Sequence, residues 1–264
     1  RILKQLKAEG RQATRAEQAQ LVKYTGWGDT ALANGIFPHP KTGFKPEWAA
    51  LGKELRDLLT DEEYAAARRS TQYAHYTSEA VVRSMWDAIR RMGFAGGRVL
   101  EPASGTGHFF GLIPHEIVAK SAYTGVEMDP LTAGIAKALY PKADIREQDY
   151  EKFQAPDNFY DVAIGNPPFS GKVKKRHLGE LYSLHDFFFA KTIDKVRPGG
   201  ILAFVTSHYT MDRQDDTARR YLAERADLLG AVRLPQTAFK ENAGTEVVTD
   251  VLFFQKRDPE FQGK

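Results

Sequence analysis

The sequence predicts an α/β fold: a doubly wound, mostly parallel sheet of seven strands, preceded by an N-terminal helical region. From residue 98 onward, short apolar segments typical of strands alternate with helical segments. The linkers are short, so successive strands are expected to run parallel, with helices covering both faces. No strand-like alternation occurs before residue 98. We therefore expect an N-terminal helical region at residues 1–72 and an α/β domain at residues 73–264.

The N-terminal region reads as helices linked by loops. Before residue 26, a few apolar residues are spaced among residues that favour helices. A Gly- and Pro-rich segment follows at residues 26–46. Helical spacing returns over 48–69, where Thr60 and Glu63 form a capping-box pattern. Ser78 then begins a further helix, which ends at a glycine-rich stretch.

The α/β region contains seven predicted strands with helices between most of them. The strands are expected at 98–101, 122–127, 143–146, 160–165, 200–206, 228–234 and 247–255. The helices are expected at 109–120, 131–139, 181–196 and 216–225.

Composition excludes several classes of protein. Hydrophobic residues make up 42% of the chain, enough for a packed core, and no apolar run is long enough to cross a membrane. The absence of cysteine excludes disulfides and cysteine-based metal sites, and the seven histidines show no metal-ligand spacing, so no metal is expected. A cysteine-free chain fits a reducing cytoplasm, and a cytoplasmic location is expected. A net charge of +3 neither requires nor excludes a nucleic-acid partner.

A glycine turn follows the first predicted strand. The segment 101–107 reads Glu-Pro-Ala-Ser-Gly-Thr-Gly, and Glu127 closes the next strand, where a carboxylate can accept both hydroxyls of a ribose. Phe110 replaces the third glycine of a dinucleotide fingerprint, and no phosphate-binding Gly-x4-Gly-Lys loop occurs. Because Glu101 suits a positively charged ligand, we expect a nucleoside with a cationic or zwitterionic tail. A tight turn without a ligand is the alternative.

The sharpest signal is Asn166-Pro167-Pro168-Phe169, directly after the fourth strand. The two prolines fix φ and donate no hydrogen bonds, and the residue before a proline is held extended. The result is a rigid loop of acceptors beside the Asn166 amide oxygen. Two acceptors on an exocyclic amine localise its lone pair for attack on a sulfonium methyl group. Phe169 offers a flat face for a base flipped out of its duplex.

At this point the chain resembles the N6-adenine DNA methyltransferases of the gamma class over residues 73–256. The glycine turn departs from the family pattern by Glu101 for Asp and Ser104 for Cys, and Ser78 replaces a usual Pro. The resemblance implies a Rossmann-like methyltransferase fold, S-adenosylmethionine as cofactor and double-stranded DNA as substrate. The cofactor site that it implies consists of Tyr76, Thr77, Glu101, Pro102, Ala103, Ser104, Gly105, Gly107, Glu127, Met128, Asp149 and Asn166. The catalytic residues that it implies are Asn166, Pro167, Pro168 and Phe169.

Two features depart from the usual arrangement of that class. A target-recognition domain usually follows the catalytic domain, but about ten residues remain after the last predicted strand. The segment Tyr24-Thr-Gly-Trp-Gly28 resembles one in large phage and mobile-element proteins that join a methyltransferase to a helicase. Since the chain also starts with Arg1, we expect a module of a larger protein, with a recognition or helicase domain as partner. Trp27 is expected to be a buried anchor in preference to an active-site residue.

A basic loop is expected after the catalytic turn. Lys172, Lys174, Lys175 and Arg176 are placed to hold DNA phosphates while a base is flipped, and a solvated loop without a specific role is an equal alternative. Tyr182 and His185 lie near the base pocket by family position, and packing explains each as well.

Two other functions fit the same motifs. Methylases of protein glutamine or of RNA use the same Asn-Pro-Pro turn, although they more often carry Tyr where this chain has Phe169. A module that binds cofactor or DNA without catalysis, inside a defence or anti-restriction protein, is the second. The intact Asn166, Gly105, Gly107 and Glu127 argue against a decayed enzyme.

Overall fold

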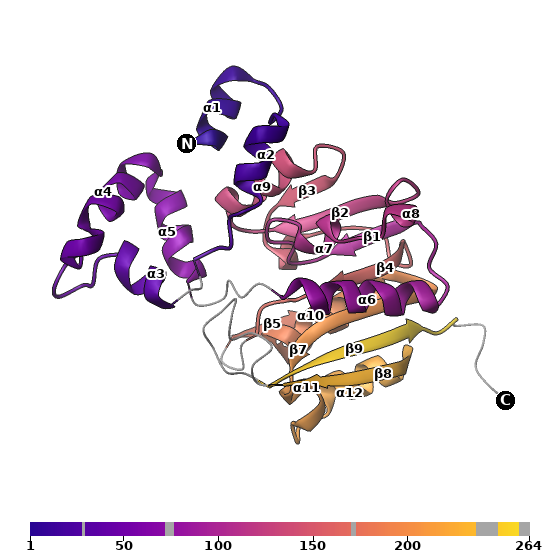
Figure 1. Ribbon diagram of the computed structural model, residues 1–264. Coiled ribbons are helices and arrows are strands. Elements are labelled where there is room, and N and C mark those ends of the chain that lie inside the picture. Colours follow the sequence, from indigo (N-terminus) through magenta and orange to yellow (C-terminus); the bar gives the residue numbers. More distant parts are fainter. Residues whose placement is uncertain (28–29, 72–76, 170–172, 236–247, 259–264) are drawn as a thin grey trace.

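A computed structural model describes residues 1–27, 30–71, 77–169, 173–235 and 248–258 (Figure 1). A seven-stranded sheet forms its centre, and helices lie on both faces, with further helices on one side at the N-terminus. The predicted doubly wound α/β architecture with an N-terminal helical region is therefore confirmed.

The sheet has the strand order β3-β2-β1-β4-β7-β9-β8. Its strands are β1 (Arg98–Glu101), β2 (Ala122–Glu127), β3 (Asp144–Glu147), β4 (Tyr160–Gly165), β7 (Val196–Ser207), β8 (Ala226–Leu234) and β9 (Thr249–Lys256). The pairs among the first five are parallel, and β9 runs antiparallel to both β7 and β8. The strand order reverses direction between β1 and β4. In open α/β sheets, ligands bind at such a switch point, beyond the carboxyl ends of the strands.

Alternation along each strand builds two hydrophobic cores, one on each face. Val99 and Leu100 are neighbours in β1, yet they belong to different cores because successive side chains point to opposite faces. The helices α6 (Glu79–Arg91), α7 (His108–Gly111) and α9 (Pro130–Leu139) cover one face. The other face is covered by α10 (Leu184–Lys195) and α12 (Thr217–Ala223). The indole N–H of Trp86 in α6 donates to the Phe109 carbonyl at 2.9 Å, which ties α6 to the helix after the glycine turn.

The N-terminal residues fold into short helices that pack beside α9. They are α1 (Ile2–Glu9), α2 (Arg15–Leu21), α3 (Thr30–Ile36), η1 (Pro46–Trp48), α4 (Ala49–Leu58) and α5 (Asp61–Ser70). The predicted capping box at Thr60 and Glu63 is present and begins α5. Gln18 of α2 donates to the Ala138 carbonyl of α9 at 3.1 Å. Trp27 packs edge-on against Phe37, with ring centroids 5.7 Å apart, in a small core of this region.

Two parts of the sequence prediction need correction. The basic segment after the catalytic turn, expected as a loop, forms a two-stranded antiparallel hairpin, β5 (Lys174–His177) and β6 (Glu180–Ser183). Its turn uses a left-handed Leu178 followed by Gly179, a pairing that is easily overlooked because Leu rarely adopts φ of 47°. The helix expected at 109–120 is two short helices, α7 and α8 (His115–Val118), because Pro114 breaks it.

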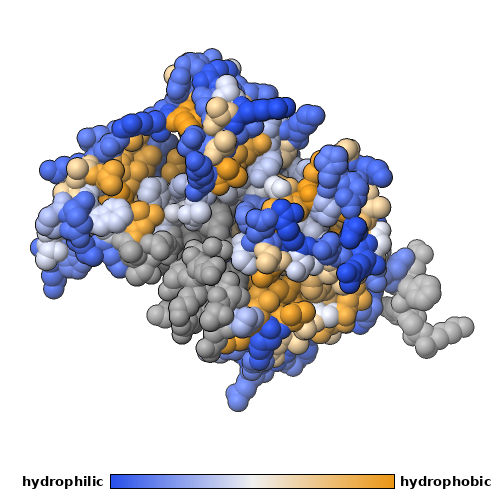
Figure 2. Space-filling view, viewed as in Figure 1, coloured by the Kyte–Doolittle hydropathy of each residue, from blue (hydrophilic) through white to orange (hydrophobic). Residues whose placement is uncertain are grey.

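The remaining elements include α11 (Tyr209–Asp212) and η2 (Tyr150–Lys152). Strand β8 lies at the edge of the sheet and exposes Leu228, Leu229 and Val232. Figure 2 shows hydrophobic residues gathered where β8 and β9 lie. Within the described residues, no helix is long and apolar enough to span a membrane.

Candidate functional site

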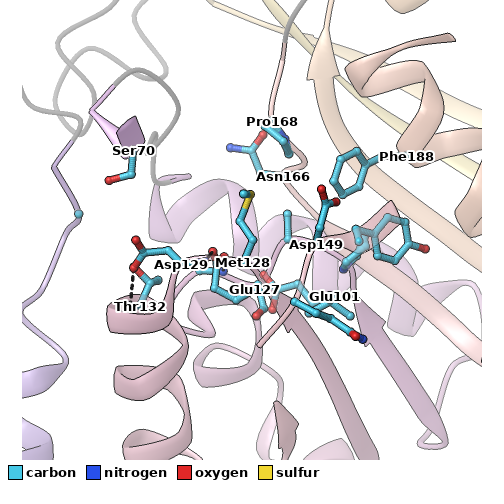
Figure 3. A pocket seen from close by; sticks show the side chains of 18 of the residues that line it. Ser70, Glu101, Glu127, Met128, Asp129, Thr132, Asp149, Asn166, Pro168 and Phe188 are labelled. Carbon is cyan, nitrogen blue, oxygen red and sulfur yellow. Dashed lines mark hydrogen bonds between the residues drawn. The ribbon is translucent and has the colours of Figure 1, made fainter. Parts of the chain in front are cut away.

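A cavity of about 410 Å³ lies at the carboxyl ends of the parallel strands (Figure 3). Parallel strands end at the same edge of a sheet, so the residues that follow β1, β2, β3 and β4 meet there although they are far apart in sequence. Residues of the predicted cofactor and catalytic sites that line the cavity are Thr77, Glu101, Pro102, Ala103, Ser104, Gly105, Glu127, Met128, Asp149, Asn166 and Pro168. The structure thus brings together eleven positions drawn from five separate segments.

The glycine turn is shaped by two residues with positive φ. Gly105 has a φ of 53° and Gly107 a φ of 81°, a region that favours glycine. A Cβ atom on Gly107 would lie 2.6 Å from the ring of Tyr140, so the turn also depends on close packing. Gly107 is absent from the cavity lining, so its contribution is to the shape of the turn.

Glu127 holds the turn to the end of β2. One carboxylate oxygen accepts from the Gly105 N–H at 2.9 Å, and the other accepts from the Asp129 N–H at 2.7 Å. Burial raises the pKa of Glu127 to about 7, although both hydrogen bonds oppose that shift. Figure 3 shows Met128, the next residue, extending across the cavity toward Asn166.

A second carboxylate, Glu101, lies beneath the first. It is 2% exposed, and its Oε2 atom has no hydrogen-bond partner within the described part of the chain. Burial, together with the charge of Glu127, raises the pKa of Glu101 well above its usual value. The buried Glu101 and the partly buried Glu127 form no salt bridge among the described residues, which favours a ligand that carries positive charge. The buried hydroxyl of Thr77, also without a partner among these residues, adds a polar contact.

Asp149 begins the turn η2 after β3. Its Oδ1 atom accepts from the Glu151 N–H at 2.9 Å and caps that turn. Its Oδ2 atom lies 3.3 Å from the ammonium of Lys175, which also pairs with Glu151. Lys175, which was expected to contact DNA, also lines the cavity.

The hairpin divides the expected basic cluster by the two-residue period of a strand. Lys175 and His177 are partly buried, and His177 pairs with Asp194 of α10 at 2.7 Å. Lys174 and Arg176 point the other way and are exposed. Lys172, like Tyr76 of the cofactor motif, lies outside the described residues.

The Asn166-Pro167-Pro168 turn leaves β4 beside the glycine turn, with trans peptide bonds. Phe169 packs against the core, and its ring lies edge-on to His185, with centroids 6.5 Å apart. His185 is 1% exposed and burial lowers its pKa, while Tyr182 is 2% exposed and packs on Tyr221. Both residues are therefore packed in the interior behind the turn.

Several cavity residues escaped sequence reasoning. The N-terminal helical region contributes one wall through Tyr24, Gly26, Ala66, Arg69 and Ser70, and α10 contributes Leu184 and Phe188. Tyr24 and Gly26 belong to the resemblance segment at 24–28, which was a usable signal. The residues from α5 carry no local motif, and their place depends on how α5 packs. No group of three or more potential metal ligands occurs within the described ranges.

Comparison with known proteins finds one family and several relatives. The model of a family described as N-6 DNA Methylase matches residues 58–264. The defense against restriction protein B of Escherichia phage P1 is 26% identical, over 82% of this chain and 10% of that protein. The type II methyltransferase M.XamI of Xanthomonas campestris pv. amaranthicola is 30% identical, over 61% of this chain and 34% of its own. The chain thus spans from a tenth to about a third of these relatives.

Solved structures show the same fold. The M protein of the type I restriction enzyme EcoKI aligns with a TM-score of 0.59 at 18% identity, over 83% of this chain and 49% of that one. The methyltransferase subunit of a type I restriction-modification system from Streptococcus thermophilus aligns with a TM-score of 0.58 at 19% identity, covering 80% and 54% of the two chains.

Proposed function

Because the chain belongs to the N-6 DNA methylase family, we propose that it transfers the methyl group of S-adenosylmethionine to the exocyclic N6 amine of adenine in DNA. The observation that carries this proposal is the position of Asn166. Its rigid turn opens onto the same cavity as Glu101, Glu127 and Asp149, although each of these residues comes from a different strand end.

The charge of the cavity supports S-adenosylmethionine as the ligand. The ligand carries a sulfonium and an ammonium, and the buried Glu101 carboxyl group lacks a partner among the described residues. We assign the cationic end to the side of Thr77 and Glu101, the ribose to Glu127 and the adenine to Met128 and Asp149. The glycine turn at 102–107 would lie against the ligand. When bound, this cofactor supplies an electrophilic methyl group.

Asn166 and the turn provide the acceptors for the target amine. The side-chain oxygen and the backbone carbonyl of Pro167 would accept its two N–H groups, which turns the nitrogen lone pair out of conjugation with the ring. Pro167 and Pro168 keep the loop rigid, so its geometry is set before the substrate arrives. Phe169 would stack on an adenine flipped out of the duplex. The exposed Lys174 and Arg176 would meet the phosphates beside it.

The larger assembly is part of the proposal. The chain covers only a tenth of its phage relative, so we propose that it acts as a module beside a recognition or helicase domain. Target choice would then be supplied by that domain.

The test is transfer of labelled methyl from S-adenosylmethionine to mixed genomic DNA, followed by nucleoside mass spectrometry. N6-methyladenine is expected, and Asn166→Ala should reduce its formation by on the order of 10³-fold while cofactor affinity stays within about twofold. Labelled glutamine or RNA, or undiminished transfer by the variant, would contradict the proposal.

A further inference from the structure

A buried lysine supports the floor of the cavity. Lys191 of α10 is 7% exposed, and its ammonium donates to the carbonyl oxygens of Tyr150 at 2.6 Å and Glu151 at 2.8 Å. It also lies 5.0 Å from the centre of the Tyr150 ring. Burial lowers the pKa of Lys191 to about 8. No carboxylate forms a salt bridge with it in the ranges that the structure describes, so these two carbonyls are its principal partners.

The two carbonyls belong to the turn that carries Asp149. Asp149 caps the start of this turn through the Glu151 N–H, and Lys191 binds the carbonyls further along it. The same segment is fixed to the neighbouring strand, because the Gln148 N–H donates to the Glu127 carbonyl at 3.0 Å. Gln148, Asp149 and Tyr150 all line the cavity.

The chemistry of this contact requires a donor of several hydrogen bonds. An ammonium has three N–H groups and can bind two neighbouring carbonyls at once. An apolar side chain in its place would leave the Glu151 carbonyl without its protein partner, and the Tyr150 carbonyl would keep only the Phe153 N–H at 3.1 Å, so the turn would be free to shift. Nothing else in the described chain hydrogen-bonds the Glu151 carbonyl. Lys191 is therefore suited to fix where Asp149 points.

We propose that Lys191 is a positioning residue for the nucleoside end of the cofactor. It holds the turn so that Asp149 and Tyr150 keep their places in the cavity wall, without touching the ligand itself. This inference rests on the proposed function only in that the cavity binds S-adenosylmethionine. Its consequence is a defect in cofactor affinity that leaves the methyl-transfer step intact.

A matched control lies one turn further along the same helix. Lys195 donates to the Ala155 carbonyl at 2.9 Å and pairs with Asp157, so it has the same kind of contact with a loop outside the cavity lining. Lys191→Met and Lys195→Met each remove one lysine that supports a loop. Lys191→Arg keeps several donors at the first position.

The experiment is calorimetric titration of the full chain and its variants with S-adenosylmethionine and with adenosine. We expect Lys191→Met to weaken both ligands by on the order of tenfold, Lys195→Met to change neither by more than about twofold, and Lys191→Arg to restore part of the loss. Thermal unfolding of each variant checks that it is folded. Where DNA methylation is measurable, KM for the cofactor should rise with kcat unchanged.

Several results would overturn the inference. They are wild-type adenosine affinity in a folded Lys191→Met, an equal loss in Lys195→Met, or a fall in kcat with no change in ligand affinity. Absence of adenosine and cofactor binding to the wild type would do so as well. Because titration needs no DNA, weakened binding by Lys191→Met in a protein that methylates no adenine supports this inference while refuting the proposed function.

Discussion

Replacing Glu127 by glutamine should remove a large part of the pH dependence of stability that the cavity creates. The carboxyl group has a pKa of about 7 in the fold, against an ordinary value of 4.5, because burial penalises its charged form. Between these two pH values the folded protein holds a proton that the unfolded chain releases. The stabilising contribution is complete below pH 4.5 and is lost as the pH rises through 7.

The size of the effect follows from that difference in pKa. A shift from 4.5 to about 7 corresponds to up to about 3 kcal/mol in the free energy of unfolding. This value is an upper bound, since Glu127 is only partly buried from the cavity side. The amide of the Glu127→Gln variant cannot titrate, so the wild type should lose up to that amount relative to the variant as the pH rises from 4.5 to about 7.5.

Urea denaturation of both proteins at several pH values measures this difference. The fluorescence of Trp86, which is fully buried, reports the transition. Comparing two proteins at each pH cancels groups that titrate alike in both. Saturating S-adenosylmethionine should flatten the wild-type profile, because a cationic ligand favours the ionised carboxylate. A wild-type-minus-variant difference that is constant, or that rises with pH, would refute the assignment of a raised pKa to Glu127.

Two further predictions concern the turn and the hairpin. Gly107→Ala should lower the free energy of unfolding in urea by about 2–4 kcal/mol, because the strain of a positive φ adds to a clash with Tyr140. The control Gly10→Ala, at a residue with a similar φ but open space around it, should lower it by about 1–2 kcal/mol. Equal losses in the two variants would mean that the clash with Tyr140 is relieved. The double variant Lys174→Ala, Arg176→Ala should bind DNA more weakly, and the slope of the logarithm of the DNA association constant against the logarithm of the salt concentration should become shallower by about 2, measured by fluorescence anisotropy. An unchanged slope would show that this face of the hairpin does not contact phosphates.

Much of the fold followed from local patterns. The bounds of β1, β2 and β4 were predicted to the residue, because an apolar strand there runs directly into a glycine, acidic or Asn-Pro turn. The capping box of α5 was equally local. The hairpin β5–β6 was missed because its strands are short and lack an apolar alternation, because β5 is basic throughout, and because Leu178 occupies a turn position where glycine or asparagine is typical.

The cavity was predicted in part. The residues Glu101, Glu127 and Asn166 were identified because each lies at the end of a predicted strand or directly after one, and the strands were expected to be parallel. The roles of Lys175 and Lys191 could not be predicted, since the first depends on which face of a hairpin points inward and the second on how α10 crosses the turn after β3. The contribution of α5 to the cavity wall is of the same kind.

The sequence by itself determined the order of strands and helices, the family and the residues that gather at the edge of the sheet. These depend on periodicity, on glycine and proline geometry and on motifs, all of which are local. Only the tertiary structure decided the raised pKa values of Glu101 and Glu127, the inward direction of Lys175, and the support that Lys191 gives to the Asp149 turn. The physical reason is that burial and hydrogen bonding depend on contacts between segments distant in the chain, and these form only when the sheet and its helices pack together.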